Sequence, residues 1–260
     1  MKTIRELNLC DDFLFHEVMM EEDMVKPLLE EALDLKGRIR KITYIEDEKT
    51  IRSGYNGKGV RLDVYVEDEE DTIYNVEMQQ VRSRSLAMRS RKYQSNIDHE
   101  MLKKGQDYDK LKKQYIIFIC TFDPYGHGLH RYTFTNRCRE TSQEMGDGTC
   151  KVFLSTRGTA DDVSAELKAF LDFVEDSSPQ NAERLDDGFV RDVSRRIESI
   201  KADEEMGGVF MTFEEKLDEI AKEAAKETIK DQARKMKQKG YPLEDIMEIS
   251  GLSREEIEDL

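Results

Sequence analysis

The chain has 260 residues, which allows one full domain with an appendage or two small domains. Its 41 Lys and Arg and 56 Asp and Glu residues give a net charge of -15, which excludes a generally basic nucleic-acid coat protein. The longest apolar run, Tyr115 to Cys120, is far below the roughly 20 residues of a membrane span, and the first twenty residues hold no secretory signal. Four scattered cysteines without a CxxC pair indicate reduced thiols, so we expect a cytoplasmic protein without membrane contact.

The first half of the chain predicts alternating helices and strands. Apolar residues at helical spacing indicate a helix over 9–35, which Pro27 should break or kink and Gly37 should end. Apolar residues alternate over 60–66, and acidic residues separate this segment from a second apolar run over 72–79, which predicts a hairpin. The other expected elements are a strand within 39–52, a glycine-rich loop over 53–59, a helix over 84–104 that ends at Gly105, and a buried strand over 114–121.

The second half predicts a few more sheet elements and then helices. The expected elements are strands over 131–136 and 151–155, a short amphipathic helix over 162–174, and a linker over 175–188. Thr212 with Glu215 makes a capping box that predicts a helix running to about Lys239. Ser253 with Glu256 makes a second capping box, which opens the final helical turns.

Three polar side chains of the predicted hairpin should converge. Glu77 and Gln79 are two residues apart and therefore share one face of a strand. If residues 69–71 form the turn, Asp63 lies directly opposite Glu77. Two carboxylates about 4 Å apart repel by roughly 4 kcal/mol at an effective dielectric constant near 20, and a divalent cation removes this repulsion. Such a pair predicts either a Mg²⁺ or Mn²⁺ site or two solvated acids on an exposed sheet face.

These residues belong to a longer series of motifs. In chain order the motifs are Asp12 to Phe15, Arg61 to Tyr65, Tyr74 to Gln79, Arg89 to Tyr93, Gly105 to Leu111, and Phe122 to Pro124. In this order the chain resembles the PD-(D/E)XK nuclease superfamily, and more closely the recombination-promoting nuclease and transposase family of bacteria. The resemblance covers roughly residues 8–155, and the C-terminal tail also looks like that of the family.

The resemblance implies an α/β fold with a restriction-endonuclease-like core, in which helices flank a mixed central sheet. It also implies metal-dependent cleavage of DNA. Asp63 and Glu77 would be the ligands of Mg²⁺, or of Mn²⁺, with the carbonyl oxygen of Met78 as a possible third ligand.

Two positions depart from the pattern of the superfamily. Gln79 stands where most members have a lysine, and a neutral amide can orient water or donate a hydrogen bond but cannot act as a base. A metal-bound hydroxide, or an acid of the first helix such as Asp12, would then have to complete the catalytic set. His16 stands where relatives more often have lysine, and we expect it at the surface or at the edge of the cleft.

The segment from 82 to 92 is the clearest candidate for DNA contact. Its five basic residues are Arg82, Arg84, Arg89, Arg91 and Lys92, and it contains no acid. Arg84 and Arg91 are seven residues apart and share a helix face, so they predict phosphate contacts beside the cleft. The alternative is a solvated helix balanced by acids elsewhere.

The sequence therefore predicts a nuclease-like domain over 1–175, a linker and helix over 176–212, and a helical tail over 213–260 with an end that resembles a helix-turn-helix. The final segment 254–259 is net negative, which favours protein contact or self-association through the C-terminal helices over DNA reading. The expected function is a metal-dependent DNA endonuclease linked to recombination or mobile elements. The alternatives are a transposase and a catalytically lapsed nuclease fold that binds DNA or protein.

Overall fold

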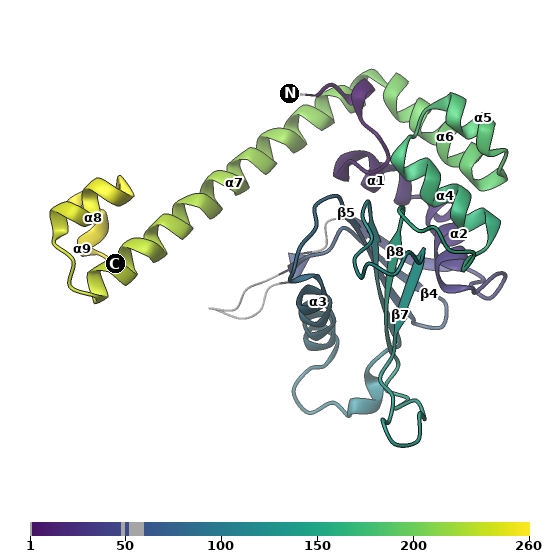
Figure 1. Ribbon diagram of the computed structural model, residues 1–260, viewed down its shortest axis with the longest axis horizontal. Coiled ribbons are helices and arrows are strands. Elements are labelled where there is room, and N and C mark those ends of the chain that lie inside the picture. The colour runs from purple at the N-terminus through teal and green to yellow at the C-terminus, as the bar shows by residue number, and fades with distance from the viewer. Residues whose placement is uncertain (1, 48–49, 52–59) are drawn as a thin grey trace. The chain divides into compact units, whose positions relative to one another are not determined.

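The computed structural model describes residues 2–47, 50–51 and 60–260. The chain divides into two compact units, Met1–Asp203 and Glu204–Leu260 (Figure 1). The predicted loop over 53–59 lies outside the described residues.

A mixed sheet of six strands forms the centre of the first unit. In spatial order the strands are β1 (Ile42–Asp47), β4 (Val64–Asp68), β5 (Ile73–Gln79), β6 (Gln114–Cys120), β8 (Thr149–Ser155) and β7 (Arg131–Phe134). The strand β6 is parallel to both β5 and β8, and the other neighbours are antiparallel. A separate pair joins β2 (Thr50–Ile51) to β3 (Val60–Arg61). The predicted mixed sheet is confirmed.

The hairpin of β4 and β5 has the predicted register. Val64 pairs with Val76, and Glu67 pairs with Ile73, which leaves the turn at 69–71. Asp71 adopts a left-handed conformation there, with φ of 60°, which a short polar side chain tolerates. Continued by one residue beyond β4, this register sets Asp63 opposite Glu77.

Helices cover both faces of the sheet. They are α1 (Asp12–Met19), α2 (Glu22–Leu33), α3 (Leu86–Met101), α4 (Ala165–Glu175), α5 (Pro179–Leu185) and α6 (Gly188–Ala202), with short 3₁₀ turns η1 (Ile4–Glu6) and η2 (Tyr108–Lys110). Figure 1 shows α3 on one side of the sheet and α2 and α4 on the other. All seven residues of β6 are buried, because a strand covered on both faces needs apolar side chains in both directions.

The N-terminal helical segment breaks earlier than predicted. The helix expected over 9–35 divides at Met20 and Glu21, where Glu21 is extended and precedes α2. Pro27 lies inside α2, so the predicted break at this residue is wrong. The lack of an N–H on proline removes one helical hydrogen bond, and the buried apolar side of α2 offsets this loss. Asp34, with φ of 56°, then ends α2 before Gly37.

The segment 175–188 contains a helix rather than a linker. The Ser178 hydroxyl accepts a hydrogen bond from the N–H of Asn181, and Pro179 occupies the first turn of α5. Serine as N-cap followed by proline is a helix-start signal, and the composition of the segment concealed it.

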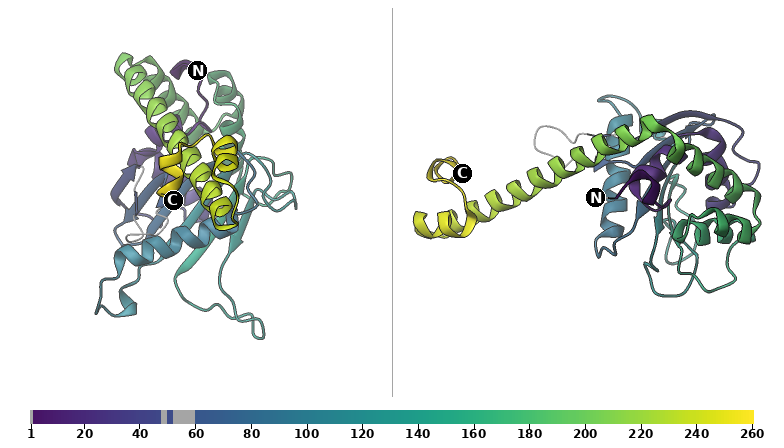
Figure 2. Two further views of the ribbon diagram at one scale, coloured as in Figure 1. Left: turned by 90° about the vertical axis from the view of Figure 1, so that its left-hand side faces the viewer. Right: turned by 90° about the horizontal axis from the view of Figure 1, so that it is seen from above.

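The second unit contains the helices α7 (Glu204–Gln238), α8 (Leu243–Ser250) and α9 (Arg254–Glu258). Figures 1 and 2 show α7 as one continuous helix. Thr212 lies inside it and donates to the Gly208 carbonyl at 3.2 Å, so the predicted helix start at Thr212 is wrong. The capping box of Ser253 and Glu256 is confirmed. No helix in the described ranges is both long and apolar enough to cross a bilayer.

A small apolar core joins the three helices of the second unit. Its buried members are Ala233, Ile246, Leu252 and Ile257. These side chains come from α7, from α8, from the turn after α8 and from α9, so the final twenty residues pack against the end of α7.

Candidate active site

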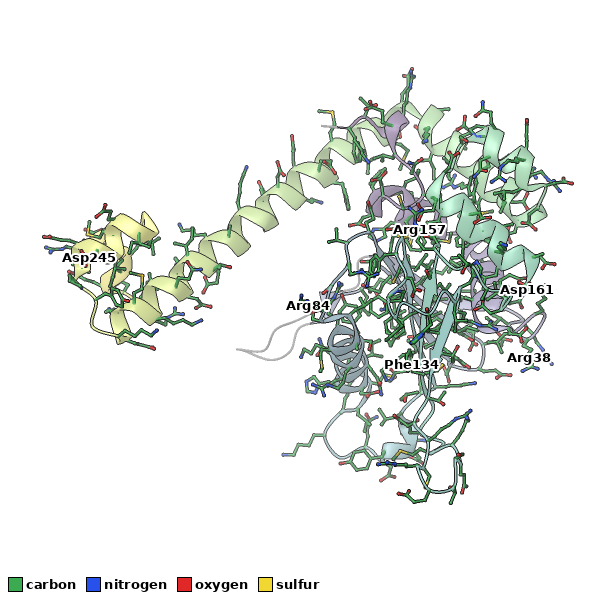
Figure 3. All side chains as sticks on the ribbon, viewed as in Figure 1. Arg38, Arg84, Phe134, Arg157, Asp161 and Asp245 are labelled. Carbon is green, nitrogen blue, oxygen red and sulfur yellow. The ribbon has the colours of Figure 1, made fainter. Side chains whose placement is uncertain are left out.

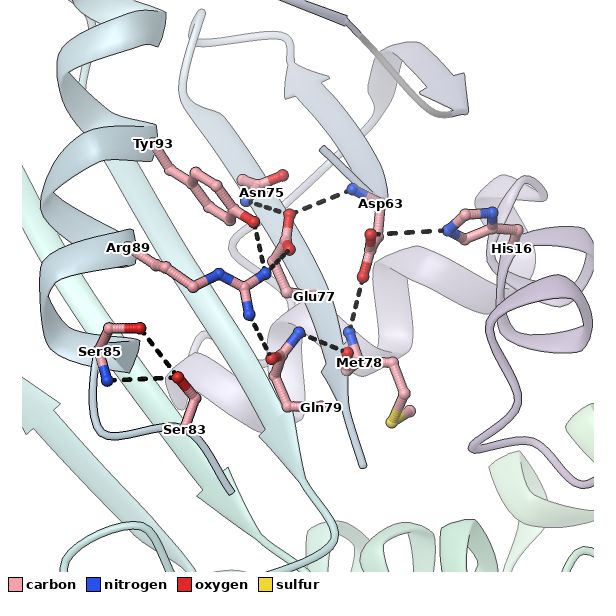
Figure 4. Close-up of polar contacts among 10 residues, drawn as sticks. All are labelled: His16, Asp63, Asn75, Glu77, Met78, Gln79, Ser83, Ser85, Arg89 and Tyr93. Carbon is pink, nitrogen blue, oxygen red and sulfur yellow. Dashed lines mark hydrogen bonds and ion pairs between the residues drawn. The ribbon is translucent and has the colours of Figure 1, made fainter. Parts of the chain in front are cut away.

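The candidate site lies between β5 and α3. Ile73 packs in the same core cluster as Leu86 and Tyr93 of α3, so this face of β5 is turned toward the helix. Because side chains alternate along a strand, Glu77 and Gln79 share the face of Ile73. The site therefore combines residues of β5 with side chains of α3 that point toward the strand (Figure 4).

Asp63 and Glu77 meet where β4 and β5 stop pairing. The backbone N–H of Asp63 donates to Oε1 of Glu77 at 3.1 Å, and the backbone N–H of Met78 donates to Oδ2 of Asp63 at 3.0 Å. The two carboxylates thus satisfy backbone groups that the sheet no longer pairs. Asp63 lies opposite Glu77, as the predicted strand register requires. Each acid also accepts a hydrogen bond from the backbone of the other strand segment.

Glu77 is the most deeply buried acid of the site, with 1% of its surface exposed. Its Oε1 also accepts a hydrogen bond from the Asn75 amide at 2.9 Å. Within the described part of the chain Oε2 accepts no hydrogen bond, and its ion pair with Arg89 spans 3.7 Å. Burial raises the pKa of Glu77 to about 7, against the opposing effects of Asn75, the Asp63 N–H and Arg89.

Arg89 turns into the site rather than outward. Its Nη1 donates to Oε1 of Gln79 at 2.7 Å, and its Nη2 donates to the Tyr93 hydroxyl oxygen at 2.6 Å. The guanidinium also lies 5.4 Å from the centre of the Tyr93 ring. The Gln79 amide donates to the Met78 carbonyl at 2.6 Å, so Gln79 links the helix to the strand backbone.

His16 is buried, and the expectation of a surface or cleft-edge position is wrong. Only 2% of its surface is exposed, and its Nε2 lies 4.0 Å from Oδ1 of Asp63. The physical reason is that α1 buries six of its eight residues, so a histidine within it is covered as well. Asp12 lies one helical turn earlier, at the exposed start of α1.

The remaining basic residues of 82–92 differ in their surroundings. Arg82 donates to the Asp123 carbonyl at 2.6 Å and stacks over Phe122. Arg84 lies before the start of α3, so the prediction that Arg84 and Arg91 share a helix face is wrong. Both residues are exposed, and Lys92 is half-buried. Figure 3 shows the Arg84 side chain at the start of α3.

The donor set of the site fits a hard divalent cation. In the ranges that the structure describes, no three His, Cys, Asp or Glu side chains cluster as metal ligands. The oxygens that could hold an ion are those of the Asp63 and Glu77 carboxylates and the Met78 carbonyl, which lie together at the end of β5. Mg²⁺ binds through one or two carboxylates and keeps several waters, and the buried Oε2 of Glu77 is an oxygen donor without a hydrogen bond.

Four features of the site escaped the sequence analysis. They are the amide of Asn75, the hydroxyl of Tyr93, the inward direction of Arg89 and the burial of His16. Two of them had a detectable signal. Asn75 is two residues before Glu77 on a strand, and Tyr93 is four residues after Arg89 on a helix, so each shares a face with its partner.

Comparison with known proteins identifies the family. Neither a search of curated proteins nor a search of solved structures finds a match. The sequence model described as PD-(D/E)XK nuclease family transposase matches residues 9–145, just over half of the chain. This segment contains the site residues from His16 to Tyr93, and the mixed sheet flanked by helices agrees with a PD-(D/E)XK α/β fold. The chain therefore belongs to the PD-(D/E)XK nuclease family transposases.

Proposed function

We propose that the protein is a cytoplasmic, divalent-metal-dependent DNA endonuclease that serves recombination or mobile elements. The observation that supports this proposal best is the pair of Asp63 and Glu77 opposed across two strands. Glu77 is almost fully buried and has Arg89 3.7 Å away, and a divalent cation held by both acids would compensate the second carboxylate charge as well. The family supports a nuclease or transposase with DNA as substrate.

Each residue of the site has a proposed task. Asp63, Glu77 and the Met78 carbonyl would hold Mg²⁺ or Mn²⁺, and such an ion polarises a phosphodiester and lowers the pKa of its water. Gln79 is an amide and takes up no proton, so it serves as a positioning residue. Asp12 is the proposed acid–base partner from α1.

DNA contact is proposed for the exposed basic residues beside the site. Arg84 and Arg91 are exposed to solvent, and Arg82 and Lys92 flank them in the sequence. In a chain of net charge -15, a local group of cations is needed to attract phosphate.

One observation favours a second candidate, a lapsed nuclease fold that binds DNA without cleaving it. Both acids accept backbone N–H bonds, so they would stay useful to the fold after cleavage was lost. A transposase is the other candidate, because the family description includes this activity.

Cleavage of supercoiled plasmid separates these candidates. We expect nicked or linear DNA with Mg²⁺ or Mn²⁺ and none with EDTA. Asp63→Asn and Glu77→Gln keep the acceptor oxygens for the backbone but lose the charge, and each should lower the rate by about 10²-fold or more. Arg137→Ala is the control, because Arg137 forms an exposed ion pair with Glu144 outside the site. DNA binding without any metal-dependent cleavage by the wild-type chain would establish the lapsed fold instead.

A further inference from the structure

Among the basic residues of 82–92, Arg89 directs its charge at the buried acid Glu77. We propose that Arg89 is the fixed cation of the carboxylate site, which balances Glu77 and stabilises the negative charge that develops on the phosphate during cleavage. The second half of this statement rests on the proposed endonuclease. The first half rests on the contacts of Arg89 with Glu77, Gln79 and Tyr93.

The position of the guanidinium is fixed by the fold. Nη1 bonds to Gln79, Nη2 bonds to Tyr93, and the guanidinium also lies over the Tyr93 ring. Tyr93 is itself buried and stacks on Phe118 in the core, with ring centres 6.1 Å apart. The side-chain entropy of the arginine is therefore lost when the protein folds, and little of it remains to be lost in the reaction.

Gln79 is matched to an arginine on the helix. Its Oε1 accepts a hydrogen bond from Arg89, and its Nε2 donates to the Met78 carbonyl. A lysine at this position would offer only donors, and its charge would repel the guanidinium. Gln79 is therefore a positioning residue for Arg89. The positive charge that a lysine would supply at position 79 of β5 is supplied by Arg89 of α3.

The charge of Arg89 acts on a carboxylate that has little access to water. Nη2 of Arg89 lies 3.7 Å from Oε2 of Glu77, which is 1% exposed. Burial disfavours the ionised form of Glu77, and the neighbouring guanidinium favours it. Arg89 also remains 36% exposed at its side chain, so the same group can meet a phosphate that enters the site.

The counter-charge is tested without any cleavage assay. Arg89→Met keeps the apolar stem and removes the charge, and Glu77→Gln removes the opposing charge. In EDTA at pH 8, we expect Arg89→Met to lower the melting temperature by several degrees in the chain with Glu77 and much less in the Glu77→Gln chain. Equal losses in the two backgrounds would refute the pairing of Arg89 with Glu77.

The catalytic half is tested by separating rate from affinity. With Mg²⁺, we expect Arg89→Met to lower the single-turnover rate by about 10²-fold, whereas its DNA affinity in Ca²⁺ changes by less than about threefold. Arg89→Lys should restore part of the rate. Gln79→Lys should also slow cleavage, and the double variant Gln79→Lys with Arg89→Met should be faster than Gln79→Lys alone, because one of two repelling charges is gone.

Each outcome decides one half of the inference. If Arg89→Met loses rate only in proportion to DNA affinity, Arg89 is a phosphate contact and not a catalytic residue. A wild-type chain that does not cleave overturns the proposed function and the catalytic half together, and the melting experiment still decides the counter-charge. Arg137→Ala should match the wild type throughout, since Arg137 pairs with an exposed acid.

Discussion

At the scale of single residues, Glu77 is a carboxylate that is buried at a cost in free energy. One of its oxygens accepts a hydrogen bond that holds the two strand ends together. Burial raises its pKa from 4.5 to about 7, although Oε1 accepts hydrogen bonds from Asn75 and from the backbone of Asp63. Desolvation therefore outweighs the hydrogen bonds and the charge of Arg89. The metal-free protein should consequently be sensitive to pH at this residue.

The pH dependence has a definite sign. Between pH 4.5 and about pH 7 the folded chain binds more protons at Glu77 than the unfolded chain does, so the free energy of unfolding falls as pH rises. We expect this fall to reach about 3 kcal/mol at most in EDTA and to vanish in Glu77→Gln. Urea unfolding at pH 5 and pH 8 measures it, with the exposed Glu144→Gln as control. Identical pH dependence in the wild type and in Glu77→Gln would contradict the burial argument.

The opposition of the two strand carboxylates was predictable, whereas the direction of the Arg89 side chain on α3 was not. A repeat of two along a strand and a short turn determine that Asp63 opposes Glu77 and that Gln79 shares its face. No such rule gives the direction of a long side chain on a helix. Arg89 has as many rotatable bonds as Arg91, and its inward direction depends on the acceptors that Gln79 and Tyr93 offer.

At the scale of elements, α3 presents different side chains to the core and to solvent. Leu86, Tyr93 and Ile97 are buried against the sheet. Arg91 of the helix and Arg84 just before it remain exposed. The helix also connects the parallel strands β5 and β6, so its position relative to the site is set by the sheet.

The two exposed arginines should contribute to DNA affinity and not to the metal requirement. Replacement of both Arg84 and Arg91 by Ala should weaken binding and lower the slope of log affinity against log salt by about one for each lost phosphate contact. Titrations at several salt concentrations measure this slope. The matched control replaces Arg137 and Arg139, which are also exposed. A slope that stays at the wild-type value would mean that these two arginines do not contact DNA.

Pro27 lies inside a helix and the segment 175–188 contains one, although their composition is typical of helix breaks and linkers. Composition predicts a break or kink at Pro27 and a linker over 175–188, but the effect of such residues depends on their neighbours. Pro27 belongs to a helix with a buried apolar side, and Pro179 follows an N-cap serine. Tertiary burial and capping geometry therefore decide such positions, and only the second has a local signal.

At the scale of the whole molecule, the candidate site and the C-terminal helices belong to different compact units. Each unit has buried side chains of its own, and those of the second unit bring residues after 241 against the end of α7. The acidic segment 254–259 remains an unsuitable partner for DNA. We therefore propose protein contact or self-association as the role of the C-terminal helices.

Deletion of residues 241–260 should leave cleavage of non-specific DNA nearly unchanged, because the candidate site lies in the first unit. It should also uncover the apolar side of α7 at Ala233, so the elution volume in size-exclusion chromatography or the solubility should change. Ile246→Asp should reproduce this effect from the core, whereas Ile249→Ser should not, since Ile249 is 68% exposed. A large loss of DNA affinity at unchanged mass in solution would instead make the tail the DNA-reading element.

Asp63 and Glu77 accept hydrogen bonds from backbone N–H groups, and this affects which residues evolution can tolerate at these two positions. Selection for a folded protein and selection for cleavage act on the same two positions but tolerate different residues. Asparagine or glutamine keeps the oxygen that the neighbouring N–H needs, and it loses the charge that an ion needs. If the proposed metal site is correct, a relative with an amide at either position would be folded and unable to cleave DNA, so an acid at both positions would be necessary for the reaction and not sufficient for it.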